Sequence, residues 1–490
     1  MNSKIKALTN IVTHVAIWLE RRLHLVKIWE ATAGHPIPKS SASWFYVFGS
    51  MTMLCLTLQI LTGILLSFVY IPSAAEAYRS LEFLNYQQEL GWFLRSIHYW
   101  GSNCMVIVMF LHMTQVFLWG AYKYPRELTW ISGVVLLFLT LGMAFTGQVM
   151  RFDADAYWGL GIGASVMGRI PIIGGQMVNF LLGGPIIGSD TLGRFFALHV
   201  FVIPGSILAL LSLHLRLVLL KGINEYPKPG IQVHRETYDA EYDKIIHEDS
   251  IPFVPNGIGK DVVANGLLLI VIVLLALFVG PKGPGIPADP TQIISEAKPD
   301  YPFLWLFAAA ALLPNGSEVL LFFVLPVIGM LLLFGLPFYS NRGEKHFSRR
   351  PISVMIVLLS YLGIGLLTYA GMTGPWSPHM EASTSQSTKP EFIQNRTPLE
   401  LQGALIFQNK QCRTCHAIGG EGGSRGPDLT TVGSRMDEPQ LVRQVIQGGG
   451  NMPAYGKNLS QEEVKALVSY LSSLNPKKNS SLKEQKEKAS

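Results

Sequence analysis

Two histidines within one long apolar stretch constrain this 490-residue chain more than any other feature. Residues 92–119 are apolar enough to cross a membrane, yet they contain His98 and His112. Fourteen residues of α-helix turn through about 1400°, about 40° short of four turns, and rise about 21 Å. The two imidazoles therefore lie on one face of the predicted helix, near opposite sides of a bilayer.

A second apolar stretch, residues 195–220, repeats the arrangement with His199 and His214. Their fifteen-residue spacing is about 60° past four helical turns. A single histidine in an apolar helix is as often a hydrogen-bonded core residue as a ligand. Ionisable residues inside a bilayer are costly and usually functional, however. Two helices with histidines at nearly the same spacing rarely arise by chance. The pattern predicts two facing histidine pairs, each able to hold one haem b through both axial positions.

The composition indicates an integral membrane protein, because the mean hydropathy is +0.31 and only 15% of the residues are charged. We expect an all-α transmembrane helix bundle with about seven spans, since each span needs about 20 apolar residues. The predicted spans are residues 44–71, 92–119, 130–150, 195–220, 262–280, 318–338 and 351–373.

The distribution of basic residues predicts the orientation of these spans. Lys and Arg number seventeen in the N-terminal segment and the loops that share its side, against five in the alternate loops. The positive-inside rule places the basic side in the cytoplasm, so residues 1–43 are expected to lie on the cytoplasmic surface as an amphipathic segment. Seven spans then place the C-terminus outside. The net charge of +6 reflects this topology, and no nucleic-acid partner is expected.

The second and fourth spans run in the same direction, so their histidines pair in sequence order. His98 and His199 are predicted to hold the outer haem iron. His112 and His214 are predicted to hold the inner one.

Glycines on the first and third spans repeat the histidine spacing. Gly49 and Gly63 are fourteen residues apart, as are Gly133 and Gly147. A porphyrin edge needs close backbone approach, which glycine permits because it has no Cβ, although membrane helices are rich in glycine for packing alone. Arginines near the histidines could bind haem propionates or extend to the membrane interface: Arg95, Arg194 and Arg216.

Four spans with this His and Gly pattern resemble cytochrome b of the Rieske/cytochrome b (bc-type) quinol-oxidising complexes. The resemblance covers roughly residues 30–375 and implies a four-helix dihaem domain at 44–250, followed by a three-helix domain at 251–375 similar to subunit IV. In the photosynthetic version a cysteine on the first span tethers an extra haem. Val47 stands at that position here, so no such haem is expected.

The same resemblance implies a quinol-oxidation site in the outer loops. Tyr157 lies in a segment similar to the family's outer-surface helices, and Pro171 to Gly175 in another. Asp300 and Tyr301 lie where the family carries a Pro-Glu-Trp-Tyr motif. Asp300 could accept the quinol proton, but an ordinary turn explains the same residues.

A second domain is predicted beyond a polar linker at residues 376–398. Residues 399–475 contain Cys412, Cys415 and His416 in the C-x-x-C-H pattern that attaches haem c, and resemble a small monohaem cytochrome c. Met452 is the expected sixth ligand of the iron, with Met436 as its rival. Residues 476–490 are expected to form a disordered tail.

The resemblance implies a function. We expect a subunit of a bacterial cell-membrane quinol:cytochrome c oxidoreductase that carries two haem b and one haem c, uses quinol and quinone as substrates and works by a protonmotive Q cycle. The implied partners are a separate Rieske iron–sulfur protein, a cytochrome c-type acceptor or terminal oxidase, and a second copy of the complex. The alternative is a dihaem membrane anchor that conducts electrons without dividing them between two paths.

Overall fold

The computed structural model of the chain describes residues 2–475 apart from short interruptions. The residues outside this description are 1, 169, 171, 184–186, 290–297, 315, 316, 318, 375–387, 411, 415, 423–425, 449–451, 453, 454, 457, 458 and 476–490. Most of the predicted linker and the whole predicted tail therefore lie outside the described residues.

Seven helices of the described chain are long and apolar enough to cross a membrane, which confirms the predicted all-α membrane bundle. The fourth span begins at Ser189 and the fifth at Phe253, both earlier than predicted. The seven spans are Phe48–Ser67, Gly91–Leu118, Glu127–Met150, Ser189–Lys221, Phe253–Phe278, Leu320–Tyr339 and Pro351–Thr373.

The remaining helices cover the two ends of the bundle or build the C-terminal domain. The helices of residues 1–374 are α1 (Asn2–Leu23), α2 (Leu25–Ala31), α3 (Phe48–Ser67), α4 (Ala77–Tyr86), α5 (Gly91–Leu118), α6 (Glu127–Met150), α7 (Ala154–Gly168), α8 (Gly174–Leu182), α9 (Ser189–Ala197), α10 (Ile203–Lys221), α11 (Tyr238–Glu248), α12 (Ile258–Phe278), α13 (Tyr301–Leu312), α14 (Leu325–Tyr339) and α15 (Pro351–Thr373). Those of the C-terminal domain are α16 (Pro398–Asn409), α17 (Val432–Arg435), α18 (Glu438–Gln447) and α19 (Gln461–Ser473).

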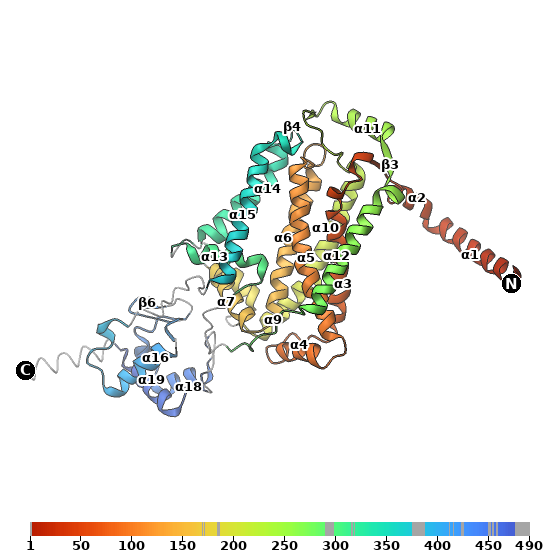
Figure 1. Ribbon diagram of the computed structural model, residues 1–490. Coiled ribbons are helices and arrows are strands. Elements are labelled where there is room, and N and C mark those ends of the chain that lie inside the picture. Colours follow the sequence, from red (N-terminus) through yellow and green to blue (C-terminus); the bar gives the residue numbers. More distant parts are fainter. Residues whose placement is uncertain are drawn as a thin grey trace, which may run out of the picture.

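Short antiparallel strand pairs tie distant loops together. They are β1 (Pro36–Pro38) with β3 (Ser250–Pro252), β2 (Gln232–Val233) with β4 (Gly343–Glu344), and β5 (Ala417–Ile418) with β6 (Glu421–Gly422). The first two pairs join the segment before α3 and the loops after α10 and α14. These loops therefore meet at one end of the bundle, where Figure 1 shows α11, β3 and β4 together.

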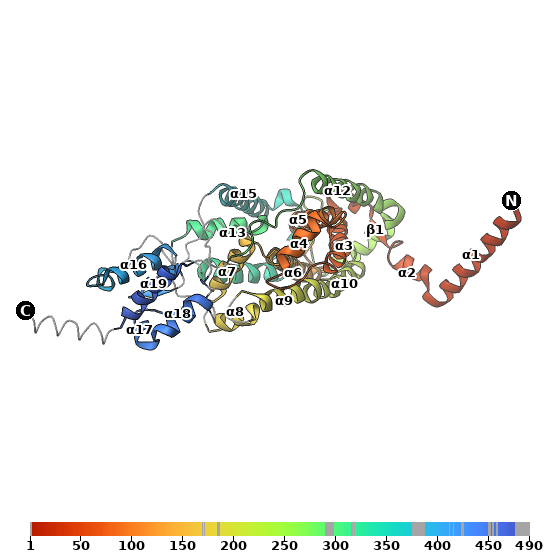
Figure 2. The ribbon, with the colours of Figure 1, turned by 90° about the horizontal axis from the view of Figure 1, so that it is seen from below.

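The histidine-bearing spans each pack against a glycine-bearing span. The helix α3 lies against α5, and α6 lies against α10. The helix α12 contacts both α3 and α5, while α13 packs against α15, an arrangement that is visible from below in Figure 2. This pairing brings the glycines of α3 close to His98 and His112, and those of α6 close to His199 and His214.

A π-helical turn explains the fifteen-residue spacing of His199 and His214. Residues Leu198–Val202 form this turn between α9 and α10, and the Ile203 N–H donates to Leu198 O, five residues earlier. A π turn holds one residue more than the α-helical hydrogen-bonding pattern. The π turn therefore accommodates the extra residue, and the imidazoles of His199 and His214 lie on one face of the helix. His98 and His112, which are fourteen residues apart, share a face without a π turn.

The C-terminal domain forms its own hydrophobic core, in which α16 packs against α19 and α18 against α19. The helix α19 begins at a capping box, because Ser460 Oγ accepts from the Glu463 N–H and the Glu463 carboxylate accepts from the Ser460 N–H. In Figure 1 the domain lies beyond the end of the bundle that carries α4, α7 and α9.

Candidate functional site

The first and third of the four histidines, His98 and His199, face each other. The ring centroids of His98 and His199 are 6.3 Å apart, with the ring planes at 70°. A metal–imidazole nitrogen bond is about 2 Å long, so two imidazoles that share one iron have ring centres about 6 Å apart. The separation of this pair therefore fits a single haem iron.

The other two histidines border a large cavity. His112 and His214 line a space of about 390 Å³ together with Gly49 and Gly133. That volume is within the usual range of sites for cofactors and small ligands. The cavity continues beyond the histidines to Arg126 and Asn224, so it extends from the membrane interior to the loops at the β2–β4 end.

Each predicted glycine lies against one predicted histidine. A Cβ built on the glycine would lie 3.4 Å from His112 Cε1 at Gly49, 3.3 Å from His98 Cε1 at Gly63, 3.5 Å from His214 Cε1 at Gly133 and 2.9 Å from His199 Cε1 at Gly147. The last distance is too short for a real Cβ contact, so a side chain there would displace the imidazole. The four glycines thus leave the space that a flat ring between the helices needs.

Three hydroxyls that the sequence analysis did not single out hold the histidine rings. Thr62 Oγ1 lies 2.8 Å from His98 Nδ1, Ser132 Oγ lies 2.9 Å from His214 Nδ1, and Thr146 Oγ1 lies 2.9 Å from His199 Nδ1. Each hydroxyl already donates its single hydrogen to a carbonyl of its own helix. It must therefore accept from an Nδ1–H, which leaves the Nε2 lone pair of that imidazole available to a metal.

A sequence signal for these hydroxyls exists. Thr62, Ser132 and Thr146 each directly precede one of the four glycines, whereas Phe48 precedes Gly49. On a helix, neighbouring residues point about 100° apart. The glycine can therefore leave space for the porphyrin edge while the hydroxyl residue before it contacts the imidazole.

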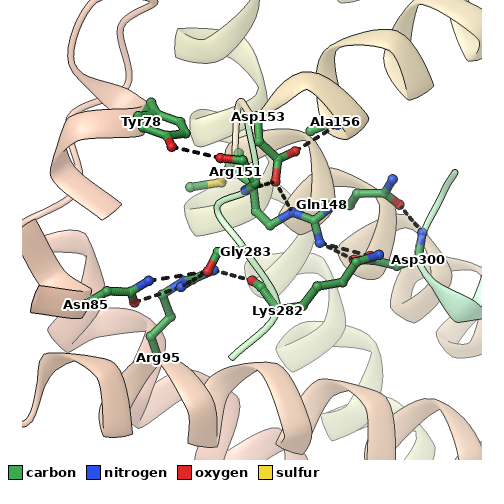
Figure 3. A network of polar contacts seen from close by, with 12 residues as sticks. Tyr78, Asn85, Arg95, Gln148, Arg151, Asp153, Ala156, Lys282, Gly283 and Asp300 are labelled. Atoms are coloured by element: carbon green, nitrogen blue, oxygen red, sulfur yellow. Dashed lines mark hydrogen bonds and ion pairs between the residues drawn. The ribbon is translucent and has the colours of Figure 1, made fainter. Parts of the chain in front are cut away.

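Arg95 makes several hydrogen bonds within the protein. Its guanidinium donates to Asn85 Oδ1 at 2.7 Å, to Gly283 O at 2.6 Å and to Lys282 O. Figure 3 shows these contacts converging on the segment that follows α12. Arg95 therefore fastens that segment to α5, and its predicted contact with a haem remains a prediction.

Asp300 is part of a partly buried ion-pair network at the same end, in which the side chain of Asp300 is 14% exposed and that of Lys282 39%. Arg151 donates to both its carboxylate oxygens at 2.9 and 3.0 Å, and Lys282 Nζ lies 2.8 Å from Oδ1. Gln148 accepts from its backbone N–H at 3.0 Å (Figure 3). Burial alone would raise the pKa of Asp300, but Arg151 and Lys282 hold it below its usual range. In this conformation the carboxylate is a weak proton acceptor.

The two tyrosines of the predicted quinol site lie in different surroundings. Tyr301 begins α13 and its hydroxyl donates to Asn103 O on α5 at 2.8 Å. Tyr157 is buried in α7 and packs edge-on against Phe152 and Trp158. Asp300 and Tyr301 are therefore adjacent at the start of α13, whereas Tyr157 belongs to the hydrophobic cluster beneath α4 and α7.

The C-terminal domain presents its histidine in a defined orientation. His416 Nδ1 donates to Pro427 O at 2.8 Å, so its Nε2 is available to a metal. A Cβ at Gly426 would collide with this imidazole, which shows how closely the loop covers it. Cys412 packs against the domain core and Cys415 lies outside the described residues.

Both methionine candidates pack against the core of that domain. Met452 and Met436 border the same cluster of buried residues. Gln444 Nε2 lies 3.7 Å from Met452 Sδ, a contact that orients the thioether. The choice of Met452 as the sixth ligand remains a prediction.

Fold and site together define a membrane-bound b-type cytochrome joined to a c-type domain. The family described as cytochrome b/b6/petB matches residues 33–222, and the family described as cytochrome c oxidase, cbb3-type, subunit III matches residues 399–471. Cytochrome b6 of Synechococcus elongatus is 39% identical over 207 residues, which is 42% of this chain and 96% of that protein.

Two further matches extend the comparison. The menaquinol:cytochrome c reductase cytochrome b subunit of Bacillus subtilis is 35% identical over 214 residues, covering 42% of this chain and 96% of that protein. A solved hyperthermophilic respiratory complex III chain aligns with a TM-score of 0.62 and 25% identity, over 80% of this chain and 95% of that one. This chain belongs to the cytochrome b/b6 family. Its two cytochrome domains imply haem b and haem c.

Gly147→Ala is expected to disturb the outer histidine pair. Because the new Cβ would meet His199 Cε1 at 2.9 Å, and close-packed interiors absorb such overlap poorly, His199 should move and the membranes should lose about half of their b-type absorbance. The reduced-minus-oxidised difference spectrum measures this loss. Gly205→Ala on α10 is the control, since a Cβ there meets nothing within 4 Å; equal spectra in the two variants would contradict the prediction.

Thr62→Val keeps the shape of the side chain but removes the acceptor for His98 Nδ1–H. Loss of such a partner typically weakens metal binding about 10-fold to 100-fold, so the purified variant should lose outer haem b faster during detergent washing. Thr57→Val on the same helix is the control, because Thr57 also bonds a carbonyl four residues earlier but lies on the exposed face. Identical haem retention in the two variants would contradict the assigned role.

Met452→Ala is expected to lower the midpoint potential of haem c. A thioether ligand raises that potential, and axial ligands span a range of about 0.8 V, so a fall on the order of 0.1 V is expected. Redox titration of the c-type absorbance in the full chain measures it. Met436→Ala is the control; a fall in that variant and none in Met452→Ala would reverse the assignment.

Proposed function

We propose that this chain is the cytochrome b and c subunit of a bc-type quinol:cytochrome c oxidoreductase. The observation that supports it most strongly is the arrangement of the four histidines in two pairs. A glycine lies against each imidazole, and a hydroxyl accepts a hydrogen bond from three of the four rings. In this proposal His98 and His199 hold the outer haem b, and His112 and His214 hold the inner one. Cys412 and Cys415 attach haem c. His416 and Met452 then bind its iron.

When bound, the haems supply one-electron carriers between the two faces of the membrane and to the c-type domain. The protein residues hold the imidazoles in place, exclude water from the bundle interior and manage protons at the two ends. The proposed substrate is quinol at the outer end, and quinone is its oxidised product. The reductase named for the Bacillus subtilis relative supports this substrate class.

The outer quinol site is proposed at the start of α13, with Asp300 and Tyr301 closest to the substrate and Tyr157 supporting the adjoining wall. Asp300 is paired with Arg151 and Lys282 in the present conformation. To accept a quinol proton it must first leave those partners, because they lower its proton affinity. We therefore propose that quinol binding and the release of Asp300 from Arg151 and Lys282 occur together.

The inner site is proposed at the end of this cavity that Tyr46, Arg126 and Asn224 line, beyond the space between His112 and His214 that the inner haem would occupy. Most of the cavity wall is apolar and a smaller number of polar groups line it, as in typical binding sites for small ligands. Quinone reduction there takes up protons inside, and quinol oxidation at the other end releases protons outside. Together they form a protonmotive Q cycle in which each quinol gives one electron to haem c and one to the haem b pair.

The proposed assembly is a multi-subunit complex in the bacterial cell membrane. The complex III match supports the assembly, and the basic loops at the β2–β4 end support a cytoplasmic position for that end. A separate Rieske iron–sulfur protein would carry the electron to haem c, since the two cysteines left after Cys412 and Cys415 lie in α3 and α5. The acceptor beyond haem c would be a cytochrome c or a terminal oxidase, and the complex would be a homodimer.

Oxidant-induced reduction tests this function. Membranes are given quinol, the inner site is blocked with an inhibitor, and a pulse of oxidant is added while haem b absorbance is recorded. If electrons divide at an outer site, oxidising haem c should drive further reduction of haem b. Simultaneous oxidation of haem b and haem c would instead indicate a membrane anchor that conducts electrons along one path.

A further inference from the structure

The polar end of the inner cavity is continuous with a buried charge network. Asn224 lines the cavity, and its Oδ1 accepts from Lys345 Nζ. Lys345 Nζ also lies 2.6 Å from Glu225 Oε1. The Lys345 side chain is only 5% exposed and that of Glu225 is 17% exposed, so the pair connects the cavity wall to the protein surface.

Further polar groups complete this network. Tyr238 Oη donates to Glu225 Oε2 at 2.9 Å and accepts from Arg126 Nη1 at 2.7 Å. Arg126, which also lines the cavity, donates two further hydrogens to Gly222 O and Lys221 O. The charged groups and phenol around the Lys345 ammonium are thus Glu225, Arg126 and Tyr238, with Lys123 further away.

Two hydroxyls that line the cavity, those of Tyr46 and Thr140, have no hydrogen-bond partner among the described residues. The Tyr46 hydroxyl is buried and makes no hydrogen bond with any described residue, although it lines the cavity and Asn224 lies next to it without hydrogen-bond geometry. A buried hydroxyl without a partner is costly. This corner of the cavity offers Tyr46, Asn224 and Arg126 as polar partners, enough to hold a water molecule or a quinone oxygen.

The proposed reaction in this cavity needs protons that an apolar membrane interior cannot provide. Reducing one quinone takes two electrons and two protons and forms two O–H bonds. An efficient proton donor has a pKa near the working pH. Burial lowers the pKa of the Lys345 ammonium to about 8, with the Glu225 carboxylate opposing that shift. Burial would raise the pKa of Glu225, but Lys345 and Arg126 together hold it below its usual range.

We propose that Lys345 and Glu225 form the proton-supply pair of the inner quinone site. A Lys345 N–H bond breaks as a proton moves, past Asn224 and across the polar corner of the cavity, to the reduced quinone oxygen, where an O–H bond forms. Lys345 then regains a proton from the inner solvent through the partly exposed Glu225. The second proton follows the same route after the second electron arrives. This inference rests on the proposed function.

A purely structural role for the same residues makes a different prediction. Lys345 and Glu225 also join the loops after α10 and α14, so they could simply hold these loops together. Arginine separates the two roles, because it keeps the positive charge and the hydrogen bonds to a carboxylate but does not release a proton in proteins. Lys345→Arg should preserve a structural tie and abolish proton supply.

The experiment follows haem b in the complete complex after an oxidant pulse with quinol present and the inner site left open. Haem b is first reduced from the outer site and then re-oxidised by quinone at the inner site. In Lys345→Arg and in Glu225→Gln the re-oxidation should be at least about tenfold slower, as expected for loss of a positioned proton donor. The initial rate of the preceding reduction should be unchanged. Re-oxidation in the wild type should be slower in D2O than in H2O.

Lys123→Arg is the matched control. Lys123 is a second buried lysine at this end, but its ammonium donates to the backbone carbonyls of Ser340 and Arg342 and does not bond a cavity residue. Its variant should re-oxidise haem b at the wild-type rate. An equal slowing in Lys123→Arg would overturn the proposal, because any disturbance of these loops would then have the same effect.

Two other outcomes would also overturn the proton-supply pair. One is a wild-type rate in an assembled Lys345→Arg or Glu225→Gln complex, with assembly judged by its b-type spectrum. The other is a wild-type re-oxidation rate that is equal in H2O and D2O, a measurement that needs no variant. A wild-type complex that shows no oxidant-induced reduction of haem b would instead contradict the proposed function itself, so the two failures are distinct.

Discussion

An imidazole inside a membrane must satisfy both of its ring nitrogens, and much of this structure follows from that requirement. Lipid offers no hydrogen-bond partners, so His98, His199 and His214 each give Nδ1–H to a hydroxyl on the neighbouring helix. That partner must itself be satisfied, and it is, through a carbonyl one turn earlier. The arrangement requires α3 beside α5 and α6 beside α10, which is the packing observed.

Buried charged side chains are likewise paired with a partner of opposite charge at the two ends of the bundle. At one end Arg151 and Lys282 neutralise Asp300, and at the other Glu225 neutralises Lys345. Breaking a buried ion pair leaves an uncompensated charge and is strongly destabilising. A buried carboxylate or ammonium that must exchange protons therefore needs a partner that stays charged in its place. Arg126 meets this condition beside Glu225 when Lys345 gives up its proton, because arginine does not lose its own proton in proteins. When Asp300 takes up a proton, the carboxylate of Asp153 still lies 3.3 Å from Arg151 Nε.

Much of the fold was predictable because membrane helices leave strong sequence signals. Apolar runs of about 20 residues predicted the seven spans. The glycines at the histidine spacing predicted close backbone approach to a porphyrin edge, without indicating which helices pack together. The hydroxyls of Thr62, Ser132 and Thr146 are common in helices and carry no signal unless read with the glycine that follows. The partners of Asp300 come from loops 149 and 18 residues away, and no local pattern encodes such contacts.

The π-helical turn at Leu198–Val202 lets the helix contain one more residue without changing the direction in which the later side chains point. An extra residue in a regular α-helix would rotate everything after it by about 100°. Here the disturbance ends within one turn, so α9 and α10 each keep the orientation that their own neighbours require. Cofactor geometry on this helix therefore tolerates an insertion that sequence spacing registers as a mismatch. A search that demanded identical ligand spacing on the two helices would reject a chain whose three-dimensional arrangement is intact.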